Sequence, residues 1–89
     1  MMKQLPPTFT KQAEESMRDA DPEAAGELIA LIRSLTDSPY HPDSKPLPRE
    51  IGMRYLPYPV DYPKYRIVYR HDGPRIRVVK VETVERFVW

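Results

Sequence analysis

The clearest alternation of hydrophobic and polar positions lies in residues 64–89. Two runs rich in Val, Ile and Tyr, KYRIVYR and RIRVVKVETVERFVW, flank the turn sequence HDGP. Side chains on a strand alternate between its two faces. In the first run the apolar set comprises Tyr65, Ile67 and Tyr69, and the basic set comprises Arg66 and Arg70. The pattern predicts an antiparallel β-hairpin with one apolar and one cationic face.

The register of this hairpin decides how far the cationic face extends. With Asp72 and Gly73 as the two loop residues, Arg70 lies opposite Arg75. The cationic face then comprises Arg66, Arg70, Arg75 and Arg77, and the apolar face Tyr65, Ile67, Tyr69, Ile76 and Val78. A slip of one residue moves Arg75 and Arg77 to the other face, and a longer loop is possible because a proline follows the turn. The two first-strand arginines stay together in any register. Since like charges opposite each other destabilise a sheet, this face is either splayed into water or kept for an anionic partner.

Helical spacing dominates the first half of the chain. Thr10 is a fair N-cap for a first helix over residues 10–20, whose apolar stripe is thin. Asp21 and Pro22 predict the start of a second helix, because Asp caps and Pro suits the first helical position. This main core helix ends by residues 37–39, since the residue before a proline disfavours the α region. The stripes comprise Ala13, Met17 and Ala20 in the first helix and Ala25, Leu28, Ile29, Ile32 and Leu35 in the second.

Prolines shape the remaining segments. They make residues 1–9 a frayed or edge segment and residues 39–50 an extended connector, from which Leu47 is expected to enter the core. Residues 51–58 are a strand candidate. Two helices followed by three antiparallel strands predict an α+β fold, with an N-terminal helical hairpin packed on a small twisted antiparallel sheet of three to four strands. We expect one domain, residues 1–89.

Composition excludes several classes of protein. The chain has no cysteine, so it has neither a disulfide framework nor a thiolate metal site. Its two histidines, His41 and His71, form no spaced ligand motif, and we expect no metal and no cofactor. No apolar run approaches the ~20 residues of a membrane span, and no signal peptide precedes the fold. We therefore expect a soluble cytoplasmic protein.

Charge is distributed unevenly along the chain. Residues 1–44 hold four basic and eight acidic side chains, a net charge of −4, whereas residues 45–89 hold ten basic and five acidic ones, a net charge of +5. Two solvated faces of opposite sign would explain this split. The cationic hairpin face favours instead a C-terminal half that contacts nucleic acid.

Three stretches together resemble the RelE/ParE superfamily of toxins from bacterial type II toxin–antitoxin systems. LIRSLTDSPYHPDSKPL is similar to the family's helix exit, KYRIVYR to its central strand, and VVKVETVERFVW to its last strand and terminal Arg-x-x-aromatic ending. The resemblance covers approximately residues 10–89. It implies a helical hairpin packed on a twisted antiparallel sheet.

RelE-type members cut mRNA in the ribosomal A site, so the resemblance implies ribosome-dependent mRNA cleavage as the first expectation. The cationic face fits this substrate, because arginine stays protonated and grips phosphate in a bidentate manner. An aromatic side chain can stack on a splayed base. By the resemblance, catalytic roles fall to Arg54, Arg66 and Arg86, and nucleic-acid binding to Arg54, Arg66, Arg70, Arg77 and Trp89.

The chain departs from the family pattern at its C-terminal end. The usual terminal aromatic is a tyrosine, whereas Trp89 has no hydroxyl and can only stack or donate through its indole N–H. Val84 and Glu85 replace the usual basic residues. A nuclease that uses Glu82 or Glu85 as its base is one alternative. Two others are a ParE-type member that lacks the nuclease constellation and poisons DNA gyrase, and a catalytically silent binding module of the same fold.

The resemblance also implies a cognate antitoxin as the protein partner. An acidic, partly disordered antitoxin segment is expected to fold across Arg54, Arg66 and Arg70. The simplest interpretation of His71 is a polar residue beside a turn, with an acid–base role only if it folds back toward Arg66. The tyrosines are expected to serve mostly in packing.

Overall fold

The computed structural model describes residues 6–38, 40–59, 61, 63–72 and 75–83. The helices are α1 (Lys11–Asp19) and α2 (Pro22–Asp37), and the strands are β1 (Thr8–Phe9), β2 (Lys45–Pro46), β3 (Met53–Tyr58), β4 (Tyr65–Asp72) and β5 (Arg75–Thr83). The predicted α+β class is confirmed. Neither described helix is long and apolar enough to cross a membrane.

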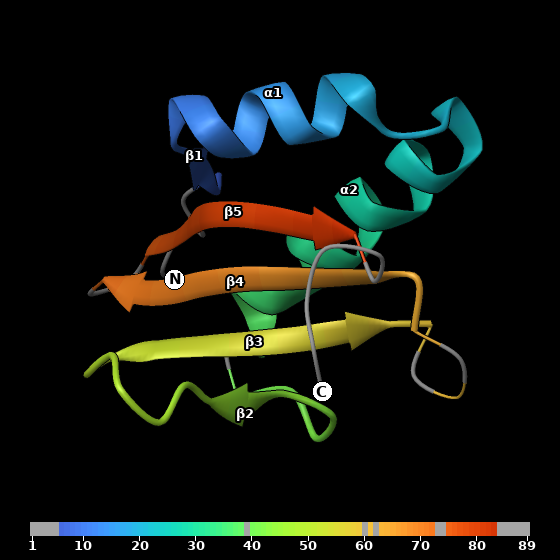
Figure 1. The fold of residues 1–89 in the computed structure, drawn as a ribbon. Helices are drawn as coiled ribbons and strands as arrows, with labels where there is room; N and C mark the ends of the chain where they lie inside the picture. The colour runs from blue at the N-terminus through green and yellow to red at the C-terminus, as the bar shows by residue number, and fades with distance from the viewer. Residues whose placement is uncertain (1–5, 39, 60, 62, 73–74, 84–89) are drawn as a thin grey trace.

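The strands form one mixed sheet in the order β1-β5-β4-β3-β2 (Figure 1). The parallel pair is β1 with β5, and the other neighbours run antiparallel. The sequence predicted three to four antiparallel strands and missed one or two, because β1 and β2 have only two residues each and show no alternation. Thr8 and Phe9 do form an edge strand, as predicted for the start of the chain; residues 1–5 lie outside the described residues.

α1 begins where the sequence predicts. Thr10 is its N-cap, and the Thr10 hydroxyl accepts a hydrogen bond from Ala13 N at 3.1 Å while donating one to the Val79 carbonyl of β5. Ala13 is fully buried and Met17 packs half-buried against the core. The helix therefore lies along the β5 side of the sheet, at the top of Figure 1.

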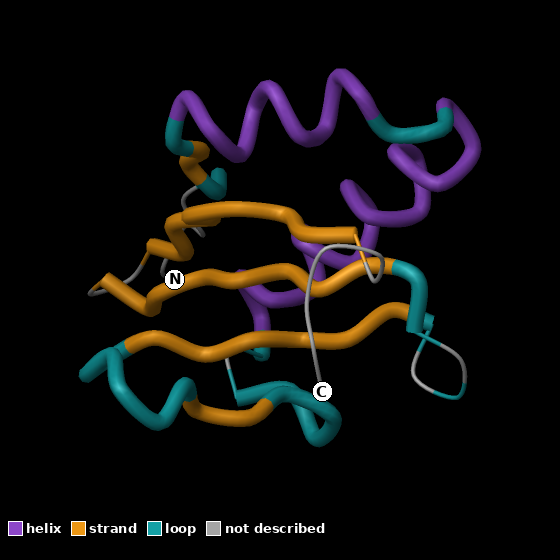
Figure 2. The backbone as a smooth tube through the Cα atoms, viewed as in Figure 1, coloured by secondary structure: helices purple, strands orange, loops and turns teal. Residues whose placement is uncertain are grey.

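α2 supplies most of the helical part of the core. Asp21 occupies the N-cap position, although its side chain makes no capping hydrogen bond. The fully buried residues of the helix are Leu28, Ile32 and Leu35. Ile29 was predicted in the same stripe, but it is 40% exposed, since it lies about 100° round the helix from the fully buried Leu28. Figure 2 shows α2, in purple, behind the strands, and no described helix crosses the opposite face.

β4 and β5 form the predicted hairpin in a register shifted by two residues. Asp72 pairs with Arg75, and Arg70 pairs with Arg77 rather than with Arg75. The predicted register would have placed Pro74 in the ladder opposite His71, where proline has no N–H to donate. Gly73 and Pro74 lie outside the described residues. Because the shift is even, side chains near the turn keep their predicted faces.

Val79 is an extra residue on β5, since neighbouring residues of β4 pair with Val78 and Lys80. Such a β-bulge leaves one residue unpaired and increases the local twist. Alternation resumes beyond it, with Glu82 directly opposite Arg66. Lys80 and Glu82 consequently join the arginines on one face of the sheet.

The sheet has a core face, which packs against α2, and a second face that no described helix covers and that we call the open face, although Val68 is fully buried on it. The buried core face comprises Leu56, Ile67, Tyr69, Ile76, Val78 and Val81. By register, the open face carries Lys45, Met53, Tyr55, Pro57, Arg66, Val68, Arg70, Arg75, Arg77, Lys80 and Glu82. The open face is therefore predominantly basic.

Leu47 does not enter the core as predicted. It lines a pocket that also contains Arg66 and Lys80, so it covers part of the open face. The connector takes this course because β2 ends at Pro46 and the chain then turns back, with Leu47 N donating to Met53 O at 2.9 Å. Gly52 completes the turn at φ +82°, a conformation that side-chain-bearing residues rarely adopt.

Candidate functional site

Basic residues from three strands share the open face. They are Lys45 of β2, Arg66 and Arg70 of β4, and Arg75, Arg77 and Lys80 of β5. Arg70 lies directly opposite Arg77, and both side chains are exposed. Like charges in this position cost stability, so the arrangement suits a surface that an anionic partner neutralises. The structure thus brings together three of the predicted binding residues, Arg66, Arg70 and Arg77.

Arg66 is the most enclosed of these basic side chains. Its Nη2 donates to Glu82 Oε1 at 2.7 Å, and its Nε donates to the same oxygen at 3.2 Å. The Arg66 guanidinium carbon lies 5.4 Å from the centre of the Tyr55 ring, close enough for a cation–π contact. Lys80 Nζ approaches the same Glu82 oxygen at 3.7 Å. Glu82 therefore serves as a counter-ion, a role that competes with action as a general base.

A pocket of about 280 Å³ lies beside this ion pair. Its lining comprises Leu47, Pro48, Arg49, Glu50, Arg66 and Lys80. A larger hollow of about 440 Å³ lies between α1 and the end of β5, lined by Gln12, Ser16, Asp19, Ala20, Tyr65, Lys80, Val81, Glu82 and Thr83. Lys80 borders both spaces, whereas Glu82 borders only the one beside α1.

Arg54 lies on the other side of the sheet from Arg66. It pairs with Tyr69 of the core face, while the open face of β3 carries Met53, Tyr55 and Pro57. The Arg54 guanidinium donates three hydrogen bonds to Ser44: Nε and Nη2 to its hydroxyl at 3.1 and 3.0 Å, and Nη2 to its carbonyl at 3.2 Å. Its carbon also lies 5.0 Å from the Tyr40 ring centre. The predicted grouping of Arg54 with Arg66 and Arg70 is therefore not formed.

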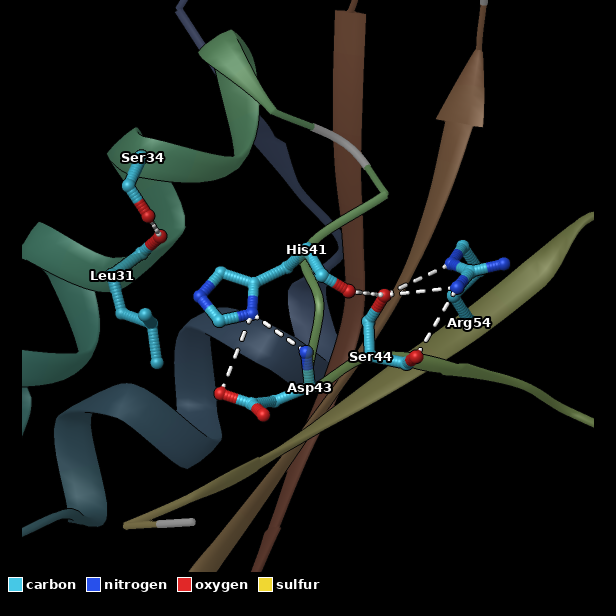
Figure 3. A network of polar contacts seen from close by, with 6 residues as sticks. All are labelled: Leu31, Ser34, His41, Asp43, Ser44 and Arg54. Carbon is cyan, nitrogen blue, oxygen red and sulfur yellow. Dashed lines mark hydrogen bonds and ion pairs between the residues drawn. The ribbon is translucent and has the colours of Figure 1, made fainter.

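The Arg54 contacts belong to a network that anchors the connector (Figure 3). Ser44 is 7% exposed, and its hydroxyl donates to the His41 carbonyl at 2.7 Å. Asp43 N donates to His41 Nδ1 at 3.0 Å, and Asp43 Oδ2 lies 3.8 Å from the same nitrogen. His71 stands edge-on to the Tyr40 ring at 5.9 Å, on the face opposite Arg66. His71 is not placed for acid–base work beside Arg66.

The sequence matches the family model described as ParE toxin of type II toxin–antitoxin system, parDE, over residues 8–86. The chain belongs to this family. It is a toxin of a type II toxin–antitoxin system, within the RelE/ParE group predicted from its motifs. No curated protein matches the sequence.

Solved structures share the fold of this toxin over most of its length. The RelBE2 toxin–antitoxin complex from Mycobacterium tuberculosis contains a chain 24% identical in sequence, with a TM-score of 0.70, covering 89% of this chain and 99% of that one. The intact E. coli RelBE toxin–antitoxin complex matches at 20% identity and a TM-score of 0.73, covering 89% and 95%. The YoeB/ParE toxin from Agrobacterium tumefaciens matches at 18% identity and a TM-score of 0.73, covering 89% and 98%.

Several predicted site residues of the toxin lie outside the described residues. These are Arg86 and Trp89, together with Glu85. Two basic residues that adjoin Arg66 in the pocket, Lys80 and Arg49, were not among the site residues predicted from the sequence. If the bulge at Val79 had been recognised, the alternation along β5 would have placed Lys80 on the same face as Arg66. Arg49 sits in a turn, where no periodicity reports its direction.

One tyrosine of the toxin has a perturbed ionisation. The Tyr58 hydroxyl donates a hydrogen bond to Glu27 Oε2 of α2. This hydrogen bond, with smaller effects of desolvation and of the Glu27 charge, raises the pKa of Tyr58 above its ordinary value of 10.0. The contact is structural, because Tyr58 packs against the core on the side away from Arg66. Within the described ranges, no three His, Asp or Glu side chains are grouped to hold a metal ion.

Proposed function

We propose that this toxin inhibits growth by poisoning DNA gyrase, as ParE-type members do, and that it cuts no RNA. The match to a ParE family model supports the proposal. We further propose that residues 1–89 act as one domain in the cytoplasm, where gyrase works.

The observation that carries the proposal is the direction of Arg54. RNA cleavage through the 2′-hydroxyl needs a base, a group that stabilises the phosphorane charge, and an acid for the leaving oxygen, all close to one phosphate. Arg66 could stabilise charge, but β3 contributes Met53, Tyr55 and Pro57 to its face and turns Arg54 away. Glu82 is occupied by Arg66 and Lys80.

Ribosome-dependent mRNA cleavage has one supporting observation, the shared face of Arg66, Arg70 and Arg77, which suits a phosphate backbone. It stays a prediction beside the gyrase proposal. Both activities are therefore measured on the same protein preparations.

The test incubates the purified toxin with gyrase, ATP and supercoiled plasmid, and measures linear DNA released when the enzyme is denatured. We expect linear DNA with the wild type and with Arg33→Ala, an exposed change on α2, and at least several-fold less with Arg70→Ala combined with Arg77→Ala. Messenger RNA on programmed ribosomes should remain intact. If mRNA were cleaved in a manner that depends on Arg66, the target would be the ribosome rather than gyrase. If neither linear DNA nor cleaved mRNA were formed, the protein would be a binding module without either activity.

We also propose a cognate antitoxin as the neutralising partner. The M. tuberculosis and E. coli relatives were crystallised as toxin–antitoxin complexes. An acidic antitoxin segment on the open face would reach Arg66, Arg70 and Arg77, while Arg54 lies outside such a contact.

A further inference from the structure

Two exposed hydrophobic side chains lie at one end of the sheet. Among the described residues, the large hydrophobic side chains that remain exposed are Ile29, Tyr40 and Ile51. Ile51 is fully exposed in the turn that leads into β3, at the left of Figure 1. Tyr40 is 66% exposed, and its ring centre lies 5.0 Å from the guanidinium of Arg54 near the start of the same strand. We call Tyr40 and the turn of residues 48–52 together the tip.

Backbone hydrogen bonds tie the turn, although all of its side chains are exposed. Leu47 N donates to Met53 O at 2.9 Å, and Met53 N donates to Glu50 O at 3.2 Å. A Cβ added at Gly52 would meet no atom within 4 Å, so the turn stands clear of the sheet at this point. A contact surface that is fixed beforehand loses less entropy on binding. The tip therefore presents Ile51 to a partner in a defined place.

Tyr40 is also fixed by its neighbours. The Arg54 guanidinium lies over its ring, and the His71 ring stands edge-on to it at 5.9 Å. Arg54 is in turn anchored by its hydrogen bonds to Ser44. The centres of protein interfaces are enriched in tyrosine and arginine, and a few such side chains supply most of the binding energy. Single exposed hydrophobic residues are common, but an exposed isoleucine and tyrosine at one end of the sheet indicate an interaction site.

The chemistry of the tip favours a protein partner other than a second copy. Four of the six residues that line the pocket of about 280 Å³ are charged, and the hollow of about 440 Å³ beside α1 is lined mostly by polar residues. Neither of these two spaces suits an isoleucine. Nucleic acid is a poor match as well, because isoleucine has no ring to stack on a base and no group to donate or accept a hydrogen bond. An apolar depression on another protein would take Ile51 out of water.

We propose that the tip is the surface with which the toxin docks on the gyrase protein, with Ile51 in an apolar depression of gyrase and Tyr40 beside it. The basic open face begins next to the tip, because Arg70 pairs with Met53 at the start of β3. Gyrase that holds DNA offers an apolar protein surface beside phosphates, which matches a hydrophobic tip beside arginines. This inference rests on the proposed function for the identity of the partner and adds the surface that binds it.

Removing the apolar side chain should weaken docking and leave the fold intact. Because Ile51 is fully exposed in the free toxin, Ile51→Ser should leave urea unfolding unchanged. Burying such a side chain in an interface changes affinity by roughly tenfold or more. We therefore expect the toxin concentration that gives half-maximal DNA breakage to rise by at least about tenfold, while the maximal amount of linear DNA stays the same.

The experiment titrates the wild type, Ile51→Ser, Ile51→Leu and Ile29→Ser against gyrase, ATP and supercoiled plasmid, and measures linear DNA. Ile51→Leu keeps an apolar side chain of the same size and should act near the wild-type concentration. Folded Ile29→Ser, the same change outside the tip, should do so too. Equal half-maximal concentrations for the wild type and Ile51→Ser, or an equal loss with Ile29→Ser, would overturn this inference alone. A wild type that releases no linear DNA would refute the gyrase target and this inference with it.

A second measurement follows binding of fluorescent toxin to gyrase without DNA. Ile51→Ser should weaken this binding by a similar factor at low and at raised salt, since ions do not screen an apolar contact. Tyr40→Ala should weaken it as well. A loss that appears only when DNA is present would assign the tip to DNA. A wild type that is dimeric where Ile51→Ser is monomeric would assign it to a second copy. Either result would overturn the proposal.

Discussion

Arg54 and Arg66 are identical side chains on neighbouring strands with different surroundings. Arg54 is anchored to a nearly buried serine by three hydrogen bonds, while Arg66 borders a pocket of about 280 Å³. A hydrogen bond to a charged group is worth more than a neutral one, and a buried acceptor left unpaired adds a penalty. At the residue scale, we therefore expect Arg54 to contribute to stability and Arg66 to the proposed partner contact.

The first prediction separates these two roles. Arg54→Ala should lower the free energy of unfolding by about 1–3 kcal/mol, because the Ser44 hydroxyl and carbonyl oxygens lose the donors of the guanidinium. Toxin that remains folded should break DNA with gyrase as the wild type does. Arg66→Ala should cause the larger loss of DNA breakage. Urea unfolding and the gyrase assay measure the two effects; a loss of activity in folded Arg54→Ala larger than in Arg66→Ala would place Arg54 in the site after all.

Tyr58 gives a prediction about pH. Its pKa is raised, so the hydrogen bond to Glu27 is intact below the unfolded value of 10.0 and is lost as the pH rises through the folded pKa. The difference between the ultraviolet titration curves of the wild type and Tyr58→Phe should show one tyrosine that ionises with a pKa above the ordinary value of 10.0. Glu27→Gln should bring that transition down. A transition that Glu27→Gln leaves unchanged would show that another group causes the shift.

At the scale of elements, Thr10 joins the start of α1 to the bulge of β5. Its hydroxyl caps the helix at Ala13 N and donates to the carbonyl of Val79, the extra residue of the bulge. Thr10→Ala should cost about 1–2 kcal/mol of folding stability, measured by urea unfolding. Thr10→Ser retains the hydroxyl and should cost much less. Equal losses for the two variants would assign the effect to the methyl group instead.

The core helix offers a matched pair for a further prediction. Ile32 is fully buried and Ile29 is 40% exposed, although both lie in the apolar stripe of α2. Ile32→Ala should lower the free energy of unfolding by about 2–5 kcal/mol, through lost burial and the cavity left behind. Ile29→Ala should cost well under half as much. Similar losses would mean that Ile29 contributes to the core beyond its exposure.

The same elements show what sequence patterns could predict. The hairpin faces were predictable because an alternation of period two survives any even change of register, and the observed change is two residues. The helix starts were predictable because Thr10 and the Asp21-Pro22 pair carry local capping chemistry. These features depend on neighbours in sequence.

Features that depend on distant contacts were not predictable. Arg54 was grouped with Arg66 on the family resemblance, and no sequence signal relates the register of β3 to that of β4 across the intervening proline-rich segment. Leu47 was predicted to enter the core because its side chain is apolar. Apolar character alone does not indicate which face of a sheet a connector crosses, and Leu47 lies beside Arg66 and Lys80 instead. The pairing of Glu82 with Arg66 depends on the bulge at Val79, which has no glycine to mark it.

At the scale of the whole molecule, folding and the proposed partner binding would make opposite demands on the open face. The formal net charge of the chain is only +1, yet the described part of the open face collects basic side chains from three strands. Their mutual repulsion opposes folding of the free toxin and favours capture of an anionic partner. Removing one such charge should therefore stabilise the toxin and weaken its function.

Arg77→Gln tests this opposition, because Arg77 lies directly opposite Arg70. We expect the free energy of unfolding to rise by about 0.2–1 kcal/mol at low salt and DNA breakage with gyrase to fall. The stability gain should shrink as salt is added, since ions screen exposed charges over ~10 Å at 0.1 M. Arg33→Gln, the same charge change on the exposed side of α2, should alter neither property. If Arg77→Gln destabilised the toxin at low salt, the repulsion between Arg70 and Arg77 would be too weak to matter, and the basic face would impose no cost on folding.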